Sequence, residues 1–373
     1  MTSTWSNIPG LTPTLESWQS AAWYRVDRVG FLMMNHDKPA VEAGTLESGT
    51  RILVQPDDGA LPLLQLISDA QHSIYIKQFT FTHPDLLQAV IAANRAGRDV
   101  RVMLNPHRSS GDRANDVPFA ELQAAGVKVE WANPAFAVTH EKSMVIDDRL
   151  ALVATFNLAE KYLTETRDYG LVTDQPVEVA QIRDCFIADW ERKPFHPRPG
   201  SALLWSNQNS RGMMSAFIDS ARHTLDIQHP KFVDATILER IVQARARGVR
   251  VRLLCGGKHG ISSWDVLDTF ASLRVLSHMD VKVRKQKNYR LHAKLIIVDD
   301  KAALIGSMNI DRSAFDLRRE LGAVVTAKAA VQLLGKVFES DWDLSHHYDA
   351  PDPLLSQGHV EDDFPHDPAL EHE

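Results

Sequence analysis

The sequence predicts an α/β protein made of two tandem α/β/α sandwich repeats that are related by a pseudo-two-fold axis. Three observations support this fold class. The chain has 373 residues, which is too long for one small core and suits two domains of ordinary size. The same succession of apolar segments occurs twice, at a period near 152 residues. A proline-rich stretch at residues 193–201 separates the copies, so we expect repeats at residues 51–192 and 202–344.

Within each repeat, strands and helices alternate. Strands are predicted at residues 73–79, 99–104 and 127–129 of the first repeat and at residues 224–228, 249–254 and 281–283 of the second. Between the first two strands lies an amphipathic helix with apolar pairs every four residues, closed by Gly97 in the first repeat and by Gly248 in the second. A final helix ends each repeat, with the apolar faces Val179, Ile182, Phe186, Trp190 and Val331, Leu334, Phe338, Trp342. This order predicts a sheet covered by helices on both faces.

The two ends of the chain lie outside the repeats. Residues 1–50 have no counterpart in the second half, and we expect a packed N-terminal leader to which the sequence assigns no role. Residues 345–373 carry eight acidic residues, several prolines and no Lys or Arg, which predicts an acidic disordered tail. Removing the eight negative charges changes the net charge from −7 to +1, so the folded body is nearly neutral. Near neutrality counts against a dedicated binder of duplex nucleic acid.

Cellular location is predicted from what the sequence lacks. Cys185 and Cys255 are far apart in apolar surroundings, which is typical of buried, reduced thiols in a cytosolic protein. No apolar stretch is long enough to cross a bilayer, and residues 1–10 do not resemble a signal peptide. We therefore expect a cytoplasmic protein without a transmembrane segment, whose contact with membranes is peripheral.

One segment of each repeat is more constrained than a fold requires. The pattern His-x-Lys-x4-Asp occurs as His140, Lys142 and Asp147, and again as His292, Lys294 and Asp299. It is followed by Thr155, Asn157 and Asp168 in the first repeat and by Ser307, Asn309 and Glu320 in the second. Corresponding residues are separated by 152 positions in every case. One copy would be a weak signal, whereas two matched copies form a specific pattern that indicates a shared active site.

The residue types in this pattern suit phosphoryl chemistry. Residues two apart on a strand point to the same face, so each histidine projects together with its lysine. Two lysines and two asparagines would surround a phosphate and stabilise the charge that develops during the reaction. One histidine can attack phosphorus while the other protonates the departing alcohol. A carboxylate on the far ring nitrogen would fix each tautomer, and this division of labour requires no metal and no cofactor.

The paired motifs resemble the phospholipase D superfamily, whose signature is a duplicated His-x-Lys-x4-Asp, and the similarity spans residues 51–344. The resemblance implies two α/β repeats with the active site at their interface and a covalent phosphohistidine. It implies His140 as nucleophile and His292 as general acid, although the residues themselves leave that order open. Lys142, Lys294, Asn157 and Asn309, with Thr155 and Ser307 in the same segments, would hold the phosphate. Asp168 and Glu320 would orient the histidines, while Asp147 and Asp299 would be mainly structural.

Two further segments narrow the resemblance. His229–Asp234 and Asn309–Ser313 resemble stretches of the second repeat of bacterial cardiolipin synthases, which implies phospholipid substrates. Ala154 replaces the usual glycine of the first motif, where it would either crowd the phosphate or be accommodated. Arg318 stands where those synthases usually have asparagine, and their paired N-terminal membrane helices are not found in this sequence. These departures favour a phosphodiesterase over a synthase.

The leading hypothesis is that a phosphatidyl group passes to a histidine and then to water, as in a phospholipase D, or to an alcohol, as in a cardiolipin synthase. A metal-independent nuclease is the main alternative, because a nucleic-acid backbone is also a phosphodiester. The basic run at residues 282–290 favours nucleic acid as a partner, and the near-neutral body disfavours it. An inactive scaffold that binds phosphate groups is the third alternative.

Overall fold

The computed structural model describes residues 49–107, 111–258, 261 and 265–354. The predicted leader, apart from residues 49 and 50, and residues 355–373 of the predicted tail lie outside the described residues. The first residues of the predicted tail belong to the second repeat. His346 and His347 form strand β16 against β11 (Lys282–Lys285), and Ala350 is buried. The packed part of the second repeat therefore extends beyond residue 344.

The first repeat contains a mixed sheet in the order β1-β7-β6-β5-β2-β3-β4. Its strands are β1 (Arg51–Gln55), β2 (Ser73–Gln78), β3 (Asp99–Leu104), β4 (Lys128–Trp131), β5 (Ser143–Ile146), β6 (Leu150–Ala154) and β7 (Thr166–Thr173). Strands β2, β3 and β4 are parallel because each is connected to the next through a helix, whereas β5, β6 and β7 follow as antiparallel neighbours.

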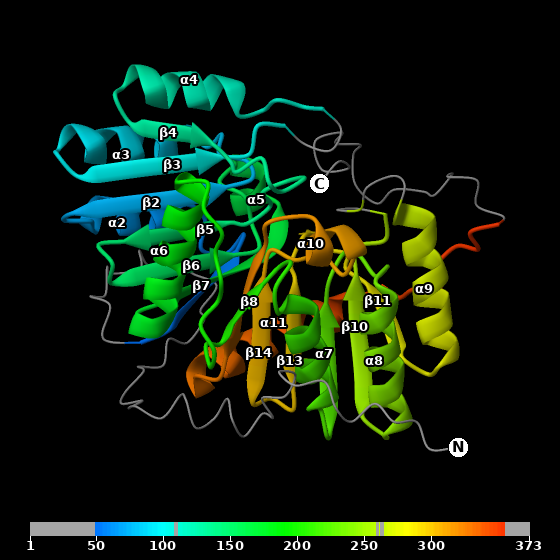
Figure 1. Cartoon of the computed structure of the whole chain (residues 1–373). Helices are drawn as coiled ribbons and strands as arrows, with labels where there is room; N and C mark the ends of the chain where they lie inside the picture. Colours follow the sequence, from blue (N-terminus) through cyan, green and yellow to red (C-terminus); the bar gives the residue numbers. More distant parts are fainter. Residues whose placement is uncertain (1–48, 108–110, 259–260, 262–264, 355–373) are drawn as a thin grey trace, which may run out of the picture.

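The second repeat has the same topology. Its sheet runs β16-β11-β10-β9-β13-β14-β15-β8. The strands not yet given are β8 (Leu203–Trp205), β9 (Thr224–Gln228), β10 (Arg250–Cys255), β13 (Leu295–Val298), β14 (Ala302–Gly306) and β15 (Leu321–Val325). Figure 1 shows the two sheets beside one another, with the first repeat in blue to green and the second in green to red. The predicted fold class of two tandem α/β repeats is confirmed.

Helices cover both sheets. They are α2 (Leu61–Asp69), α3 (Pro84–Arg95), α4 (Asp116–Ala124), α5 (Glu160–Thr164) and α6 (Pro176–Trp190) in the first repeat, and α7 (Ser210–Asp219), α8 (Ala235–Ala246), α9 (Val266–His278), α10 (Arg312–Asp316) and α11 (Lys328–Leu344) in the second. Gly97 and Gly248 adopt φ values of 88° and 89° just after α3 and α8, as the helix-cap prediction requires. No helix within the described residues has the length and apolar character that crossing a bilayer demands.

A shared apolar core joins the repeats. Each repeat has an outer core of its own, and a further cluster combines residues of both. This shared cluster includes Val153 of β6, Ile182 of α6, Ile305 of β14 and Leu334 of α11. Burying apolar area between the sheets stabilises one relative placement of the repeats, which is what an active site assembled from both of them needs.

Short strand-like segments also cross between the repeats. Strand β12 (Arg290–Leu291), which precedes His292, pairs in parallel with Thr166 and Arg167 of β7. The reciprocal bridge joins Thr139, which precedes His140, to Arg319. Each motif histidine therefore directly follows a residue whose backbone contacts the other repeat.

The motif aspartates anchor turns. Asp147 adopts a φ of 53° after β5 and accepts hydrogen bonds from the amides of Gln71, His72 and Ser73, at 2.7, 2.6 and 2.8 Å. Asp299 has the same φ and accepts from the amides of Arg222, His223 and Thr224. Each carboxylate thus binds a hairpin to the start of the neighbouring strand. These contacts agree with the structural role that we expected for both aspartates.

Candidate active site

The histidines of both motifs are held by carboxylates from the opposite repeat. Both carboxylate oxygens of Glu320 lie 3.0 Å from Nδ1 of His140. An Asp168 oxygen lies 2.8 Å from Nδ1 of His292. All four side chains are buried. When Nδ1–H donates to a carboxylate, the lone pair or the transferable proton is left on Nε2, as nucleophilic or acid catalysis requires.

The backbone reinforces this crossed arrangement. The amides of His140 and Glu141 both donate to the carbonyl of Arg319, each at 2.9 Å. The amides of His292 and Ala293 donate to the carbonyl of Arg167, at 3.2 and 2.9 Å. Arg319 precedes Glu320, and Arg167 precedes Asp168. Each histidine and the carboxylate that orients it therefore share one backbone junction, which limits how far the two can separate.

Both motif lysines fold back beside their histidines. Lys142 Nζ donates to the carbonyl of His140 at 2.8 Å, and Lys294 Nζ donates to that of His292 at 2.6 Å. Lys294 Nζ also lies 2.8 Å from Nε2 of His292. The ammonium of Lys294 is thus held next to the Nε2 atom of His292, whereas that of Lys142 is held at the backbone of His140. A cation in a dry site stabilises a phosphoryl group far more than it would in water.

The hydroxyl side chains contact the carboxylates. Thr155 donates to Asp168 and accepts from the amide of Tyr169 at 2.8 Å. Ser307 lies against the backbone of Leu321 and forms a hydrogen bond that lowers the pKa of Glu320. We expected both hydroxyls to contact the phosphate. In the ligand-free structure both hydroxyls bind the carboxylates, and their contact with a phosphate stays a prediction.

The motif asparagines are also buried, at 0% exposure for Asn157 and 1% for Asn309. Oδ1 of Asn309 has no hydrogen-bond partner within the described part of the chain. A buried amide oxygen without a partner is costly, so a ligand that donates to it would relieve that cost.

Aromatic rings pack beside both histidines. The ring centroids of Phe79 and His140 are 4.8 Å apart, and those of Tyr162 and His292 are also 4.8 Å apart.

Burial raises the pKa of Glu320 from 4.5 to about 8, although Lys142 and Arg318 act in the opposite direction. Desolvation dominates because the carboxylate has no exposed surface. In the ligand-free site burial therefore favours the protonated carboxyl group, and a positive charge on the adjacent His140 ring during the reaction favours the carboxylate.

Ala154 is accommodated in the sheet. It is fully buried in the outer core of the first repeat, where its amide donates to the carbonyl of Lys142 at 2.9 Å. Its counterpart Gly306 has no such space, because a Cβ there would lie 2.6 Å from the Cα of Gly322. The first repeat thus tolerates a methyl group at the position where the second cannot.

Four charged residues missed by the sequence reasoning connect the repeats. The guanidinium of Arg319 binds Asp189 of α6 through two hydrogen bonds of 3.0 and 2.8 Å. The guanidinium of Arg167 binds Asp341 of α11 in the same way, at 2.9 and 3.1 Å. We call these the two Arg–Asp pairs. Their signal was present in the sequence, because both the arginines and the aspartates are separated by the same 152 positions as the motifs.

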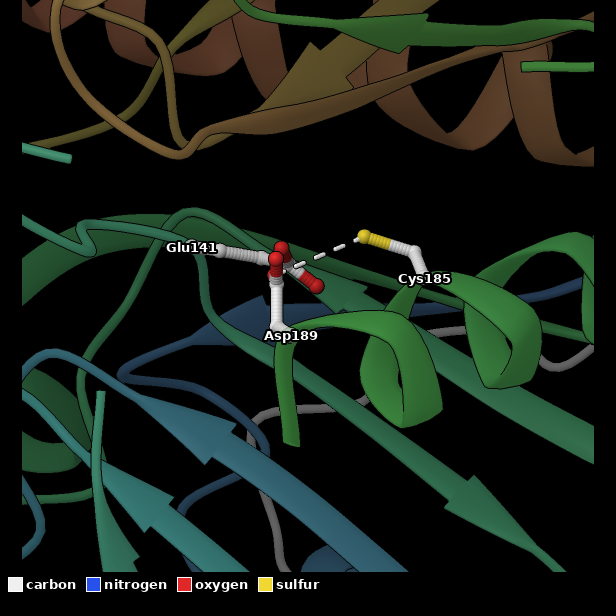
Figure 2. Close-up of side chains that lie close together, drawn as sticks. All are labelled: Glu141, Cys185 and Asp189. Carbon is white, nitrogen blue, oxygen red and sulfur yellow. Dashed lines mark hydrogen bonds between the residues drawn. The ribbon is translucent and has the colours of Figure 1, made fainter. Parts of the chain in front are cut away.

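The cluster of Glu141, Cys185 and Asp189 has donor atoms close enough together to suggest a metal site (Figure 2). Lys77 already supplies a cation there. Its Nζ lies 3.0 Å from Glu141, 2.7 Å from Asp189 and 3.5 Å from the Cys185 sulfur. A metal ion would have to displace this buried ammonium, so the residues fit a lysine-centred ion cluster better than a metal centre.

Sequence comparisons show which family the chain is similar to. The family model described as "Cardiolipin synthase, PLD-like domain", where PLD denotes phospholipase D, matches residues 63–190 and 214–342, which is more than half of the chain. Cardiolipin synthase 1 of Staphylococcus epidermidis is 25% identical over 327 residues, which cover 75% of this chain and 64% of that protein. The chain therefore spans less than two thirds of the length of that relative. The major cardiolipin synthase ClsA of Bacillus subtilis is 25% identical over 357 residues, covering 84% of this chain and 72% of that protein.

Solved structures share the fold. The phosphatidylserine synthase of Haemophilus influenzae has a TM-score of 0.66 at 15% identity, over 81% of this chain and 88% of that chain. The polyphosphate kinase of Porphyromonas gingivalis has a TM-score of 0.65 at 16% identity, over 81% of this chain and 48% of that one. The family model spans both repeats and includes both crossed histidines, so the chain belongs to the cardiolipin synthase, PLD-like domain family.

Proposed function

We propose that this chain is a phosphatidyltransferase that acts on phospholipids through a covalent phosphohistidine. The observation that carries the proposal is the crossed pairing of His140 with Glu320 and of His292 with Asp168. Two histidines with fixed tautomers, each beside a lysine, provide a nucleophile and a proton carrier in one buried site. The cardiolipin synthases among the relatives support a phospholipid as the substrate.

The reaction would proceed in two steps. Following the resemblance, Nε2 of His140 attacks the phosphorus of the donor lipid, and the bond between phosphorus and the head-group oxygen breaks. His292 gives its Nε2 proton to the departing alcohol. In the second step His292 takes the proton of an incoming alcohol or water, whose oxygen attacks phosphorus while the bond from phosphorus to His140 breaks. Lys142 and Lys294 stabilise the negative charge on the phosphoryl oxygens in both steps.

The nuclease alternative receives less support from the basic run at residues 282–290. Arg284 of this run donates to the carbonyl of Trp342 at 2.7 Å, and Arg290 lies 3.5 Å from Glu165. Lys285 is buried. These cations contact the protein itself, and among the cations of the run only Lys282 and Lys287 are exposed. Two exposed lysines do not form the extended basic surface that a nucleic-acid backbone requires. We also propose that the protein contacts anionic lipid at the membrane surface, which requires fewer positive charges than a nucleic-acid backbone does.

Lipid products provide the test. The protein would be incubated with phosphatidylglycerol vesicles, beside His140→Ala, His292→Ala and the control His278→Asn, which changes an exposed histidine at the end of α9. Mass spectrometry should detect cardiolipin or phosphatidic acid with wild type and the control, and neither product with the two motif variants. Cleavage of an oligonucleotide without any lipid product would favour the nuclease. Folded wild type that turns over neither substrate would favour the phosphate-binding scaffold.

A further inference from the structure

A ring of four charged residues lies at the backbone junction that holds His140. Glu141 follows His140, and its amide donates to the carbonyl of Arg319 at 2.9 Å. The Glu141 carboxylate accepts from Nζ of Lys77 at 3.0 Å, and the same Nζ donates to Asp189 at 2.7 Å. Asp189 in turn binds the guanidinium of Arg319, which closes the ring. We call Lys77, Glu141, Asp189 and Arg319 the charged ring.

The charged ring is buried, and its charges balance. Lys77 and Glu141 have 0% exposure, Asp189 has 1% and Arg319 has 3%. Figure 2 shows the carboxylates of Glu141 and Asp189 pointing toward each other. Two buried carboxylates repel each other, so this arrangement requires both cations. Although burial acts to lower it, the charges of Asp189 and Glu141 hold the pKa of Lys77 above its ordinary value, and the ammonium keeps its charge.

The second oxygen of the Glu141 carboxylate is bonded as well. The hydroxyl of Ser143 donates to it at 2.6 Å, and Ser143 pairs with Lys77 in the register of β2 and β5. Glu141 is therefore held at both carboxylate oxygens and at its backbone amide. Because His140 and Glu141 share a peptide bond, these contacts also restrain the position of the His140 ring.

The equivalent positions of the second repeat are neutral. In the register of β9 and β13, Gln228 occupies the place that Lys77 occupies in the register of β2 and β5. Ala293 stands 152 positions after Glu141. The basic and the acidic side chain of the first repeat are thus replaced by an amide and a methyl group.

The corresponding ring beside His292 is therefore open. Gln228 donates to Asp341 at 2.8 Å, and Asp341 binds the guanidinium of Arg167. The amide of Ala293 donates to the carbonyl of Arg167 at 2.9 Å. The methyl group of Ala293 cannot form a hydrogen bond with Gln228, so the last contact of the ring is missing on this side.

The contrast between the repeats indicates that the Lys77–Glu141 pair has a role beyond packing. Taking two charges out of water costs about as much as their attraction returns, and neutral residues often pack equally well in their place. The second repeat shows such a neutral arrangement, with Gln228 and Ala293 both at 0% exposure. Stability of the sheet therefore does not explain the two charges in the first repeat.

We propose that Lys77 and Glu141 are positioning residues that hold His140 for its attack on phosphorus. This inference rests on the proposed function, in which His140 is the nucleophile. An attacking atom must approach phosphorus in line with the departing oxygen, so a small displacement of its nitrogen slows the reaction. The charged ring limits this displacement, because it fixes the residue that follows His140 and the carbonyl that both amides contact.

The test replaces the two charges with the residues of the second repeat. Lys77→Gln combined with Glu141→Ala keeps the charge balance and leaves the Arg319–Asp189 contact in place. Rapid quenching with short-chain phosphatidylglycerol would measure the rate constant of phosphatidyl adduct formation on His140, which does not depend on the amount of folded enzyme. We expect this rate constant and kcat to fall by about tenfold, with KM nearly unchanged.

A second variant tests the charged ring without removing a charge. Ser143→Ala frees one carboxylate oxygen of Glu141 and leaves the contact with Lys77. We expect a fall in the same rate constant that is smaller than in the double variant.

The matched control is Arg252→Gln combined with Asp226→Asn. It removes another buried ion pair without changing the net charge, in β9 and β10 away from both histidines. The control should lose stability in urea and keep a rate constant near that of wild type.

A wild-type rate constant in both ring variants would overturn the inference. An equal fall in the control would also overturn it, because the loss would then follow from stability alone. A rise in KM with unchanged kcat would indicate a role in substrate binding and would overturn it as well. Absence of lipid products with wild type would instead refute the proposed function itself, and the inference with it.

Discussion

Glu320 of the second repeat places both carboxylate oxygens 3.0 Å from Nδ1 of His140 in the first repeat. Asp168 of the first repeat serves His292 of the second, so neither repeat contains a complete histidine–carboxylate pair. An isolated repeat would lack the group that fixes its histidine tautomer. The active site therefore depends on the interface between the repeats as much as on the motifs.

Replacing either orienting carboxylate should reduce turnover without abolishing binding. Glu320→Gln keeps a hydrogen-bond acceptor near His140 but removes the charge that stabilises the protonated ring, as Asp168→Asn does for His292. We expect kcat to fall by about 100-fold or more, with a small change in KM. Steady-state kinetics on phosphatidylglycerol vesicles would measure this. The control is Asp299→Asn, whose carboxylate contacts backbone amides away from the histidines. Wild-type kcat in Glu320→Gln would contradict the assigned role.

The two Arg–Asp pairs should affect catalysis through position. Arg319→Lys keeps the charge but loses the two-pronged contact with Asp189, which would let the backbone carbonyl that holds His140 shift. We expect kcat to fall about tenfold with KM nearly unchanged, because displacing a reacting group by a fraction of an ångström carries a cost of this order. Arg167→Lys should act in the same way on His292.

A matched control for these variants is Arg252→Lys. Arg252 binds Asp226 through contacts of 2.7 and 2.8 Å and is equally buried, but it lies in β10 away from both histidines. It should lose stability in urea without a comparable loss of kcat. If all three variants lose kcat in proportion to stability, the Arg–Asp pairs are structural and have no positioning role.

Stability should depend on pH through Glu320. Its folded pKa, about 8, is raised above the ordinary value of 4.5 mainly by burial. Below pH 4.5 the carboxyl is protonated in both states, and this contribution to stability is fully present. Between pH 4.5 and about 8 the unfolded chain releases the proton while the folded protein keeps it, so the free energy of unfolding falls as pH rises. Urea titrations at several pH values should show a smaller decline in Glu320→Gln than in wild type. Substitution of an exposed residue, such as Glu160→Gln, should leave the decline unchanged.

Stability should respond differently to a side-chain methyl group at the two equivalent positions, Ala154 and Gly306. Gly306→Ala would place Cβ 2.6 Å from both the Cα of Gly322 and the carbonyl oxygen of Leu321, and backbone atoms cannot move aside as a side chain can. We expect a loss of about 1–3 kcal/mol, measured by urea unfolding. Ala154→Gly in the first repeat should cost about 1 kcal/mol or less, because it removes one buried methyl and adds chain freedom. Equal effects of the two substitutions would contradict this account of the packing.

Much of the fold and part of the site could be predicted from the sequence, because duplication makes local patterns visible twice. The helices closed by Gly97 and Gly248 and the paired motifs all follow from residues close together in the chain. The crossed pairing of Glu320 with His140 does not, because it depends on how two sheets pack. The contact of Thr155 with Asp168 was not predicted either, because it depends on the pairing of β6 with β7 within the first sheet. A hydroxyl beside a phosphate motif suggests a phosphate contact until the structure shows Asp168 within its reach.

Arg318 illustrates a different limit. The sequence marks it as a departure from the related synthases, but only the structure shows that its guanidinium is buried and that its charge lowers the pKa of both Glu320 and Asp311. Electrostatic neighbours of this kind are properties of a packed interior and cannot be predicted from spacing.

The central claim is a covalent intermediate on a histidine of the crossed site. The most direct test is to quench wild-type enzyme during turnover of short-chain phosphatidylglycerol at alkaline pH, where phosphohistidine persists, and to map adducts by peptide mass spectrometry. We predict a phosphatidyl adduct on His140, its disappearance in His140→Ala, and its accumulation in His292→Ala if the leaving group departs without protonation. An adduct on His292 in wild type would reverse the assigned roles. Sustained turnover with no histidine adduct at any time point would contradict the claim.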